Sequence, residues 1–185
     1  MSRLGGGGNA GPARTAGGNA GPARTTGADA SREDRRLPDG RRPVAGAVLL
    51  RADGAVLLQH RDDVPGISHP GLWSLFGGGI EPGESPLDGM LREISEEIGV
   101  RLSEFRPLVV LEGARTVFHV YLARLEPPLE ELTLSEGQGM AFLELATALA
   151  AYDLAPVART ALEITSSLLA MRRLEGLDTP FDGWS

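Results

Sequence analysis

The sequence predicts an α/β fold in which a mixed β-sheet carries helices on its faces. Short apolar runs typical of strands are interspersed with longer segments of helical periodicity, and the two kinds do not alternate as a regular βαβ repeat. The chain has 185 residues, of which 42% are apolar, so we expect one domain of ordinary size with a substantial core.

The predicted strands are short and are separated by turn residues. An Ala-Asp-Gly turn at residues 52–54 divides two apolar runs and predicts a hairpin, and Gly113 predicts a second one. Another run ends at three consecutive glycines, residues 77–79, which we expect to form a loop. The strands are expected at residues 44–50, 55–59, 73–76, 108–111, 116–125 and 140–143.

Helical periodicity marks residues 86–98, 144–151 and 156–175. The first helix has the clearest boundaries, because Ser85 is a natural N-cap, Pro86 suits the first turn and Gly99 is a natural terminator. The last helix has an apolar stripe that could pack on the sheet or form a dimer surface, and the sequence does not decide between them. Its members are Val157, Ala161, Ile164, Leu168 and Met171.

The helix over residues 86–98 carries acids on the side away from its apolar stripe. The stripe consists of Leu87, Leu91, Ile94 and Ile98. Glu93, Glu96 and Glu97 fall together on the other side. Like charges four residues apart cost about 0.2–0.5 kcal/mol, and anions in the last helical turn cost roughly 0.3–1 kcal/mol. One interpretation is a solvated acidic helix end; the other is a hard divalent cation, Mg²⁺ or Mn²⁺, bound by the three carboxylates.

The segment before this helix is rich in glycine, with Gly77, Gly78, Gly79 and Gly83. Exposed backbone amides near a helix N-terminus suit phosphate oxygens, although a glycine-rich connector is also common. Beside a helix end with three carboxylates, the loop favours metal-assisted phosphoryl chemistry.

Residues 78–100, GGIEPGESPLDGMLREISEEIGV, resemble the signature of the Nudix family, G-x5-E-x7-R-E-U-x-E-E-x-G-U, where U is a bulky aliphatic residue. Every constrained position matches: Gly78, Glu84, Arg92, Glu93, Ile94, Glu96, Glu97, Gly99 and Val100. Residues 57–61 and 71–74 also resemble the family's flanking strand and tryptophan. The resemblance therefore covers about residues 43–150 and extends to the last predicted helix.

The resemblance implies an α/β/α sandwich in which the signature forms a loop–helix–loop. It implies that Glu93, Glu96 and Glu97 bind Mg²⁺ or Mn²⁺, with the carbonyl of Gly77 as a backbone ligand. Glu93 would also be a candidate base for the attacking water.

The other signature residues would support this site. The resemblance implies that Arg92 orients a catalytic carboxylate through a salt bridge. Glu84 would have a more structural role, paired with Arg92, and the glycines Gly78 and Gly99 would be structural as well.

Five residues outside the signature are further candidates. Many Nudix proteins add an acid from a later loop, for which Glu136 is our catalytic candidate and Glu112 the alternative; an ordinary loop acid is the other interpretation. Arg61 could contact phosphate or be a solvated arginine. Trp73 and Phe76 could line a base pocket or be core aromatics. Many relatives have proline where this chain has Phe76, which leaves the substrate open.

The implied reaction is hydrolysis of a diphosphate bond in a nucleoside diphosphate linked to another group, such as a nucleoside triphosphate or a nucleotide sugar. The alternative is a non-catalytic Nudix-fold nucleotide sensor, although such proteins usually lose signature carboxylates. An isoprenoid diphosphate isomerase is disfavoured because its chemistry depends on cysteine, and the chain has none.

Composition limits the other partners. The net charge is −7, and residues 44–185 hold ten arginines against 21 acids, so the acidic body argues against nucleic-acid binding. No stretch approaches the roughly 20 apolar residues of a membrane span. The absence of cysteine fits a reducing cytoplasm. We expect a small nucleotide substrate and a monomer or homodimer.

The chain is expected to have three parts. Residues 1–42 should be a disordered extension, because the polar unit GGNAGPART occurs at residues 7–15 and 17–25 and has no large apolar side chain. A dispensable segment is the plain interpretation, and a weakly basic arm that touches a partner is the alternative. A Nudix domain over residues 43–176 and a tail over residues 177–185 would follow.

Overall fold

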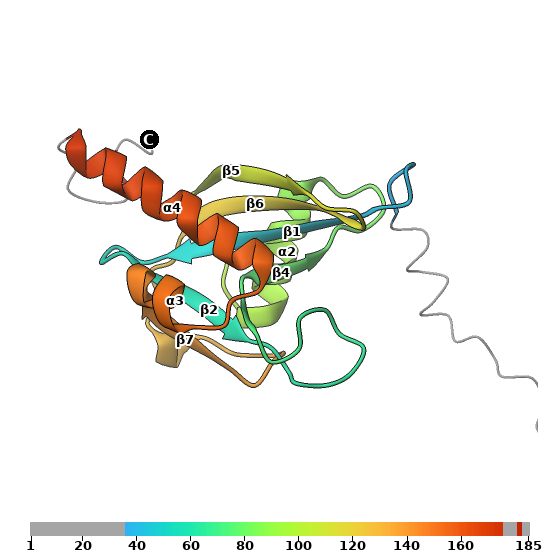
Figure 1. Cartoon of the computed structure of the whole chain (residues 1–185), viewed down its shortest axis with the longest axis horizontal. Helices are drawn as coiled ribbons and strands as arrows, with labels where there is room; N and C mark the ends of the chain where they lie inside the picture. The colour runs from blue at the N-terminus through green and yellow to red at the C-terminus, as the bar shows by residue number, and fades with distance from the viewer. Residues whose placement is uncertain (1–35, 176–180, 183–185) are drawn as a thin grey trace, which may run out of the picture.

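The computed structural model describes residues 36–175 and 181–182 (Figure 1). Its strands are β1 (Arg42–Leu50), β2 (Ala55–His60), β3 (Trp73–Ser74), β4 (Phe76–Gly79), β5 (Phe105–Glu112), β6 (Thr116–Arg124) and β7 (Gly139–Glu144). Its helices are α2 (Pro86–Ile98), α3 (Leu145–Ala151), α4 (Pro156–Leu174) and the 3-10 turn η1 (Leu129–Glu131). The expected helices and strands are present with bounds that differ by a few residues, except that the strand expected at residues 73–76 is divided between β3 and β4.

The strands described form one seven-stranded mixed sheet. Along the order β3-β2-β1-β6-β5, β1 runs parallel to β6 over its whole length, and the other neighbours are antiparallel. β4 pairs with β1 and β7 pairs with β2, both antiparallel. The mixed sheet predicted from the sequence is therefore confirmed.

The two strands of the β1–β2 hairpin are paired next to the turn and separate beyond it. The two strands pair only where Leu49 faces Leu57 and Leu50 faces Val56. Farther from the turn, β4 pairs with β1 and β3 pairs with β2, so residues 73–79 lie between the two opened arms. The glycines at residues 77–79, expected as a loop, are thus part of β4, where they lie against α2.

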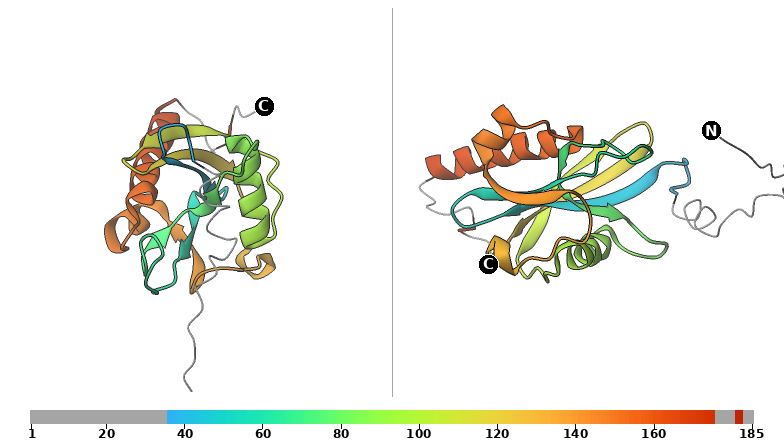
Figure 2. Two further views of the ribbon diagram at one scale, coloured as in Figure 1. Left: turned by 90° about the vertical axis from the view of Figure 1, so that its right-hand side faces the viewer. Right: turned by 90° about the horizontal axis from the view of Figure 1, so that it is seen from below.

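The sheet lies between two helical layers, as the end-on view in Figure 2 shows. Helix α2 covers one face, and α3 and α4 cover the other. The cluster under α2, here called the α2-side core, includes Phe76 and Ile94. The cluster on the opposite face, the α4-side core, includes Leu58 and Leu162. This arrangement is the α/β/α sandwich expected from the resemblance.

The buried face of α4 differs from the predicted stripe. Met171, a member of that stripe, is 53% exposed. The buried residues are Ala158, Ala161, Leu162 and Thr165. The small alanines allow α4 to approach the sheet closely, and the hydroxyl of Thr165 is satisfied because it donates to the carbonyl of Ala161 at 2.8 Å. Helix α4 therefore packs on the sheet through a face rotated from the predicted one.

The folded region begins earlier than the predicted boundary at residue 43. The N–H of Leu37 donates to the carbonyl of Arg41 at 2.8 Å and closes a turn. Arg41 pairs with Glu112 at 3.0 Å, and Arg42 is the first residue of β1. Residues 36–42 are therefore part of the domain, because they tie its first strand to the β5–β6 hairpin.

Phe181, within the predicted tail, packs against the folded domain. Phe181 is buried in the α4-side core, although residues 177–185 were expected to be only a tail. The repeats of the predicted N-terminal extension, within residues 1–35, lie outside the described residues. None of the helices described is long and apolar enough to cross a membrane.

Candidate functional site

Helix α2 begins and ends where its local signals predict. Ser85 is the N-cap: its hydroxyl oxygen accepts from the N–H of Asp88 at 3.1 Å and donates to the Asp88 carboxylate at 2.6 Å. Pro86 occupies the first turn, and Gly99 ends the helix with a φ of 74°. The apolar stripe packs in the α2-side core: Leu87, Leu91, Ile94 and Ile98, joined by Met90.

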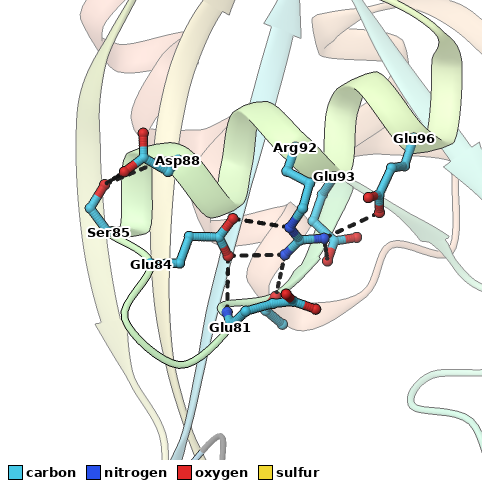
Figure 3. Close-up of polar contacts among 8 residues, drawn as sticks. Glu81, Glu84, Ser85, Asp88, Arg92, Glu93 and Glu96 are labelled. Carbon is cyan, nitrogen blue, oxygen red and sulfur yellow. Dashed lines mark hydrogen bonds and ion pairs between the residues drawn. The ribbon is translucent and has the colours of Figure 1, made fainter.

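The guanidinium of Arg92 joins α2 to the preceding loop (Figure 3). It donates to the Glu84 carboxylate at 3.0 and 3.1 Å and to the carbonyl of Gly79 at 2.8 Å. It also donates to Glu93 at 2.8 Å and to Glu96 at 3.1 Å. The hydrogen bonds with Glu84, and then with Glu93, raise the pKa of Arg92, so its charge is secure. Arg92 therefore sets the direction of the Glu93 carboxylate.

Glu97 is the most buried acid of the site, with 7% of the residue exposed. Its carboxylate accepts a hydrogen bond from the backbone N–H of Gly77 at 2.8 Å. Burial raises the pKa of Glu97 to about 8; the Gly77 hydrogen bond opposes this shift, and the charges of Glu93 and Glu136 add to it. Burial also raises the pKa of Glu93, against the lowering effect of Arg92. The site thus gathers acids in a place where burial makes their ionisation unfavourable.

Two glycines of β4 make this geometry possible. Gly77 has a φ of 136° and lies opposite Gly46 of β1, and a Cβ at position 77 would lie 2.3 Å from the carbonyl oxygen of Ala45. A Cβ at Gly78 would lie 2.4 Å from a carboxylate oxygen of Glu93. Glycine at position 77 therefore lets β4 approach β1, and glycine at position 78 leaves room for the Glu93 carboxylate.

The chemistry of these side chains fits a hard divalent cation. Carboxylate oxygens are the preferred donors, and a cation would offset both the repulsion among the acids and the cost of ionising Glu97. As the side chains stand, no three acidic or histidine residues in the described part of the chain are grouped to hold an ion. Glu93 and Glu96 are turned to Arg92, and Glu97 to Gly77. Holding an ion would require side-chain rotation, for which Glu96 has room because its side chain is 61% exposed.

Arg61 and Glu136 come to this site from loops far apart in the sequence. Together they line a cavity of about 80 Å³, whose other lining residues are Gln59, Asp62, Ile67 and Gly137. The charge of Arg61 lowers the pKa of Glu97 and that of Glu136 raises it, so both lie within electrostatic reach of the buried acid. Arg61 also donates its Nε–H to the carbonyl of Ser68 at 2.8 Å. The tertiary structure therefore adds one positively charged side chain, Arg61, and one further acid, Glu136, to the signature carboxylates.

A family model described as the NUDIX domain matches residues 40–163. The chain belongs to the Nudix family. The match begins two residues before β1, includes α2, and extends into α4. Every candidate residue of the Nudix site lies within it.

Individual relatives agree with this placement. Nucleoside triphosphatase NudI from Escherichia coli O1:K1 / APEC is 43% identical over 70 residues, which are 37% of this chain and 49% of that protein. The chain thus spans about half the length of the curated relatives it matches. The structure of a MutT NUDIX hydrolase from Burkholderia pseudomallei is 29% identical, with a TM-score of 0.57, over 66% of this chain and 96% of that chain. A mutT/nudix family protein from Listeria innocua has a TM-score of 0.61 over 76% of this chain and 99% of that chain; at 20% identity it shows the fold alone.

Two aromatic residues predicted to line the Nudix substrate pocket pack in the interior. Phe76 is fully buried in the α2-side core, which favours the interpretation as a core aromatic over a pocket wall. Trp73 is half-buried and packs against the α4-side core, where its ring stacks on His60 at 4.9 Å and meets the edge of Tyr152 at 5.3 Å. Strands β3 and β4, which carry Trp73 and Phe76 respectively, lie between β1 and β2, where side chains on both faces of the sheet are covered.

Sequence reasoning overlooked two polar residues that the fold brings to this site. Gln59 is 3% exposed, and its amide donates to the carbonyl of Glu136 at 2.9 Å. The hydroxyl of Ser135 donates to the carbonyls of Glu96 and Glu97 at 2.8 and 3.0 Å. The one available signal was a glutamine within an apolar strand, which indicates a polar partner in the interior.

Proposed function

We propose that this Nudix protein hydrolyses a phosphoanhydride bond in a nucleoside diphosphate linked to another group, with Mg²⁺ or Mn²⁺ as cofactor. The observation that carries the proposal is the buried carboxylate of Glu97. It accepts a hydrogen bond from Gly77 of β4, lies one helical turn from Glu93, and is within electrostatic reach of Arg61. The Escherichia coli relative is named a nucleoside triphosphatase and the Burkholderia relative a NUDIX hydrolase, which supports a nucleotide substrate.

The residues that would hold the cation are Glu93, Glu96, Glu97 and the carbonyl of Gly77, with Glu136 as a further acid. When bound, a divalent cation neutralises phosphate charge and makes water a better nucleophile. These are all oxygen donors, which suit Mg²⁺ and Mn²⁺ better than softer metals.

The chain's own residues would position the substrate and accept the proton. Glu93 is our candidate base for the attacking water, because burial raises its pKa and Arg92 sets its direction. Arg61 lines the same cavity as Glu136, where its guanidinium would bind a phosphate oxygen. Charge on the phosphate would thus be balanced by Arg61 as well as by the metal ion.

A substrate panel tests the proposal. Nucleoside triphosphates, oxidised dGTP, ADP-ribose, nucleotide sugars and dinucleoside polyphosphates would each be incubated with Mg²⁺, with Mn²⁺ and with chelator, and the products analysed. Glu97→Gln is the diagnostic variant, and Glu130→Gln, at an exposed acid outside the site, is the matched control. We expect metal-dependent cleavage of at least one compound by the wild type and by Glu130→Gln, with most turnover lost in Glu97→Gln.

Two results would overturn the proposal. Equal turnover by Glu97→Gln would show that the buried acid is not needed. No turnover of any compound, together with tight binding of one, would instead support a nucleotide sensor. We also propose a cytoplasmic location and a monomeric or homodimeric state, which fractionation and light scattering would test.

A further inference from the structure

The loop of residues 133–138 brings Glu136 to the candidate site. The Glu136 residue is exposed and lines the small cavity with Gln59 and Arg61, directly after Ser135, whose N–H is bonded to the backbone of Glu97. Repulsion among three carboxylates favours movement of the exposed one toward solvent. Contacts made by the rest of the loop must therefore keep Glu136 in place.

On one side, the loop is bonded to the last turn of α2. The N–H of Ser135 donates to the carbonyl of Glu97 at 3.0 Å, and its hydroxyl donates to the carbonyls of Glu96 and Glu97. The N–H of Thr133 donates to the carbonyl of Ile98 at 3.3 Å. The last carbonyls of a helix lack partners within the helix, and α2 has no basic residue in its last turn. The loop supplies the missing donors.

On the other side, the loop is bonded to the end of β2. The buried amide of Gln59 donates to the carbonyl of Glu136 itself. Gln138 donates its backbone N–H to the carbonyl of His60 at 2.8 Å and its side-chain amide to the carbonyl of Arg61 at 2.7 Å. Burying an amide is costly unless it is hydrogen-bonded, so the Gln59 contact is a specific one.

Gly137 lets this contact form. It has a φ of 89°, and a Cβ at this position would lie 2.7 Å from the carbonyl oxygen of His60 and 3.1 Å from the side chain of Gln59. A larger residue would push the loop off β2. The loop is thus fitted closely to the strand directly after Glu136.

We propose that Gln59 and Ser135 are positioning residues that together hold the carboxylate of Glu136 beside Glu93 and Glu97. Gln59 fixes the loop to the sheet, and Ser135 fixes it to the helix that carries the two signature acids. The inference rests on the proposed function, because it assigns Glu136 a share in binding the cation.

Variants with and without the donors test the inference. Gln59→Met keeps the volume of the buried side chain and removes its amide, and Ser135→Ala removes the surface hydroxyl whereas Ser135→Thr keeps one. The first readout is Mn²⁺ binding to the protein alone, followed by electron paramagnetic resonance; the second is kcat and KM on the best substrate. Residues that orient metal ligands typically affect metal affinity about 10- to 100-fold. We expect about 10-fold weaker Mn²⁺ binding in Gln59→Met and Ser135→Ala, and near wild-type binding in Ser135→Thr.

A double-mutant cycle separates positioning from general destabilisation. If Gln59 acts through Glu136, then Gln59→Met should weaken Mn²⁺ binding very little in a Glu136→Gln background. Leu58→Ala is the matched control, because Leu58 is the adjacent residue of β2 but is buried in the α4-side core. It should lower the melting temperature without changing Mn²⁺ affinity in the folded protein.

The outcomes distinguish this inference from the proposed function. Additive effects of Gln59→Met and Glu136→Gln on Mn²⁺ binding would overturn the inference. Wild-type Mn²⁺ affinity in Glu136→Gln, Gln59→Met or Ser135→Ala would also overturn it, and in both of these cases metal-dependent hydrolysis could still stand. The absence of Mn²⁺ binding by the wild type would overturn the inference as well. Conversely, the expected cycle for Mn²⁺ binding with no hydrolysis of any compound would support the positioning roles and reject the enzyme.

Discussion

The backbone N–H of Gly77 donates to the carboxylate of Glu97 at 2.8 Å, which joins the inserted strand β4 to the last turn of α2. At the same residue β4 lies close against β1, because Gly77 pairs with Gly46 and a Cβ at position 77 would lie 2.3 Å from the carbonyl oxygen of Ala45. The acid is held in the interior although burial disfavours its ionised form. Its ionisation is therefore coupled to the stability of the whole domain.

The stability of the metal-free protein should fall as pH rises from about 5 to 8. Burial raises the pKa of Glu97 to about 8 in the folded state, whereas the pKa of the carboxyl in the unfolded chain is the ordinary 4.5. Between these values the folded state holds more protons than the unfolded state, so the free energy of unfolding decreases with pH. Urea unfolding in chelator measures this. In Glu97→Gln, the free energy of unfolding should depend less on pH. If it fell with pH as steeply as in the wild type, the raised pKa would not belong to Glu97.

Gly77→Ala should destabilise the domain more than Gly83→Ala. Both glycines have positive φ values, 136° and 81°, but a Cβ at Gly77 would overlap backbone atoms whereas nothing lies within 4 Å of one at Gly83. We expect losses of about 3 kcal/mol or more for Gly77→Ala from backbone strain plus overlap, and about 1 kcal/mol for Gly83→Ala from strain alone. Urea denaturation compares them directly. Equal losses would show that β4 can move away from β1.

Arg92→Lys should impair catalysis while the fold persists. A lysine ammonium cannot reproduce the planar arrangement of guanidinium N–H groups with which Arg92 contacts Glu84, Glu93 and the carbonyl of Gly79 at the same time. We expect kcat for metal-dependent hydrolysis to fall about 10- to 100-fold, since the Glu93 carboxylate loses its orientation. Arg51→Lys is the control, because Arg51 also makes a two-point contact with a carboxylate, but in the β1–β2 turn. Equal kcat values for the two variants would argue against an orienting role.

Phe76→Ala should affect stability and leave substrate affinity almost unchanged. Phe76 is fully buried in the α2-side core, so its truncation should cost about 3–5 kcal/mol of unfolding free energy. The milder Phe76→Leu variant keeps the protein folded for kinetics, and its KM should match that of the wild type. A KM several-fold higher, without a similar rise in a Leu49→Ala control from the same core, would restore Phe76 to the substrate pocket.

Much of the fold and of the site was predictable because its signals are local. The N-cap Ser85 and the terminator Gly99 lie within a few residues of the turns they control, so the limits of α2 followed from short-range rules. The spacing of Glu93, Glu96 and Glu97 placed the acids on one side of that helix in the same way. The turn at residues 52–54 likewise predicted the first hairpin.

Only the tertiary structure decided which of these groups are buried and what they contact. Glu96 and Glu97 are adjacent and identical, yet one is exposed and the other lies beneath β4. Phe76 and Gln59 were buried by strands that meet only after the chain has folded. Helix position and charge spacing depend on neighbours within about one turn, so the sequence by itself determined them. Burial depends on contacts with segments distant in the chain, and a local sequence pattern does not specify which distant segments will make those contacts.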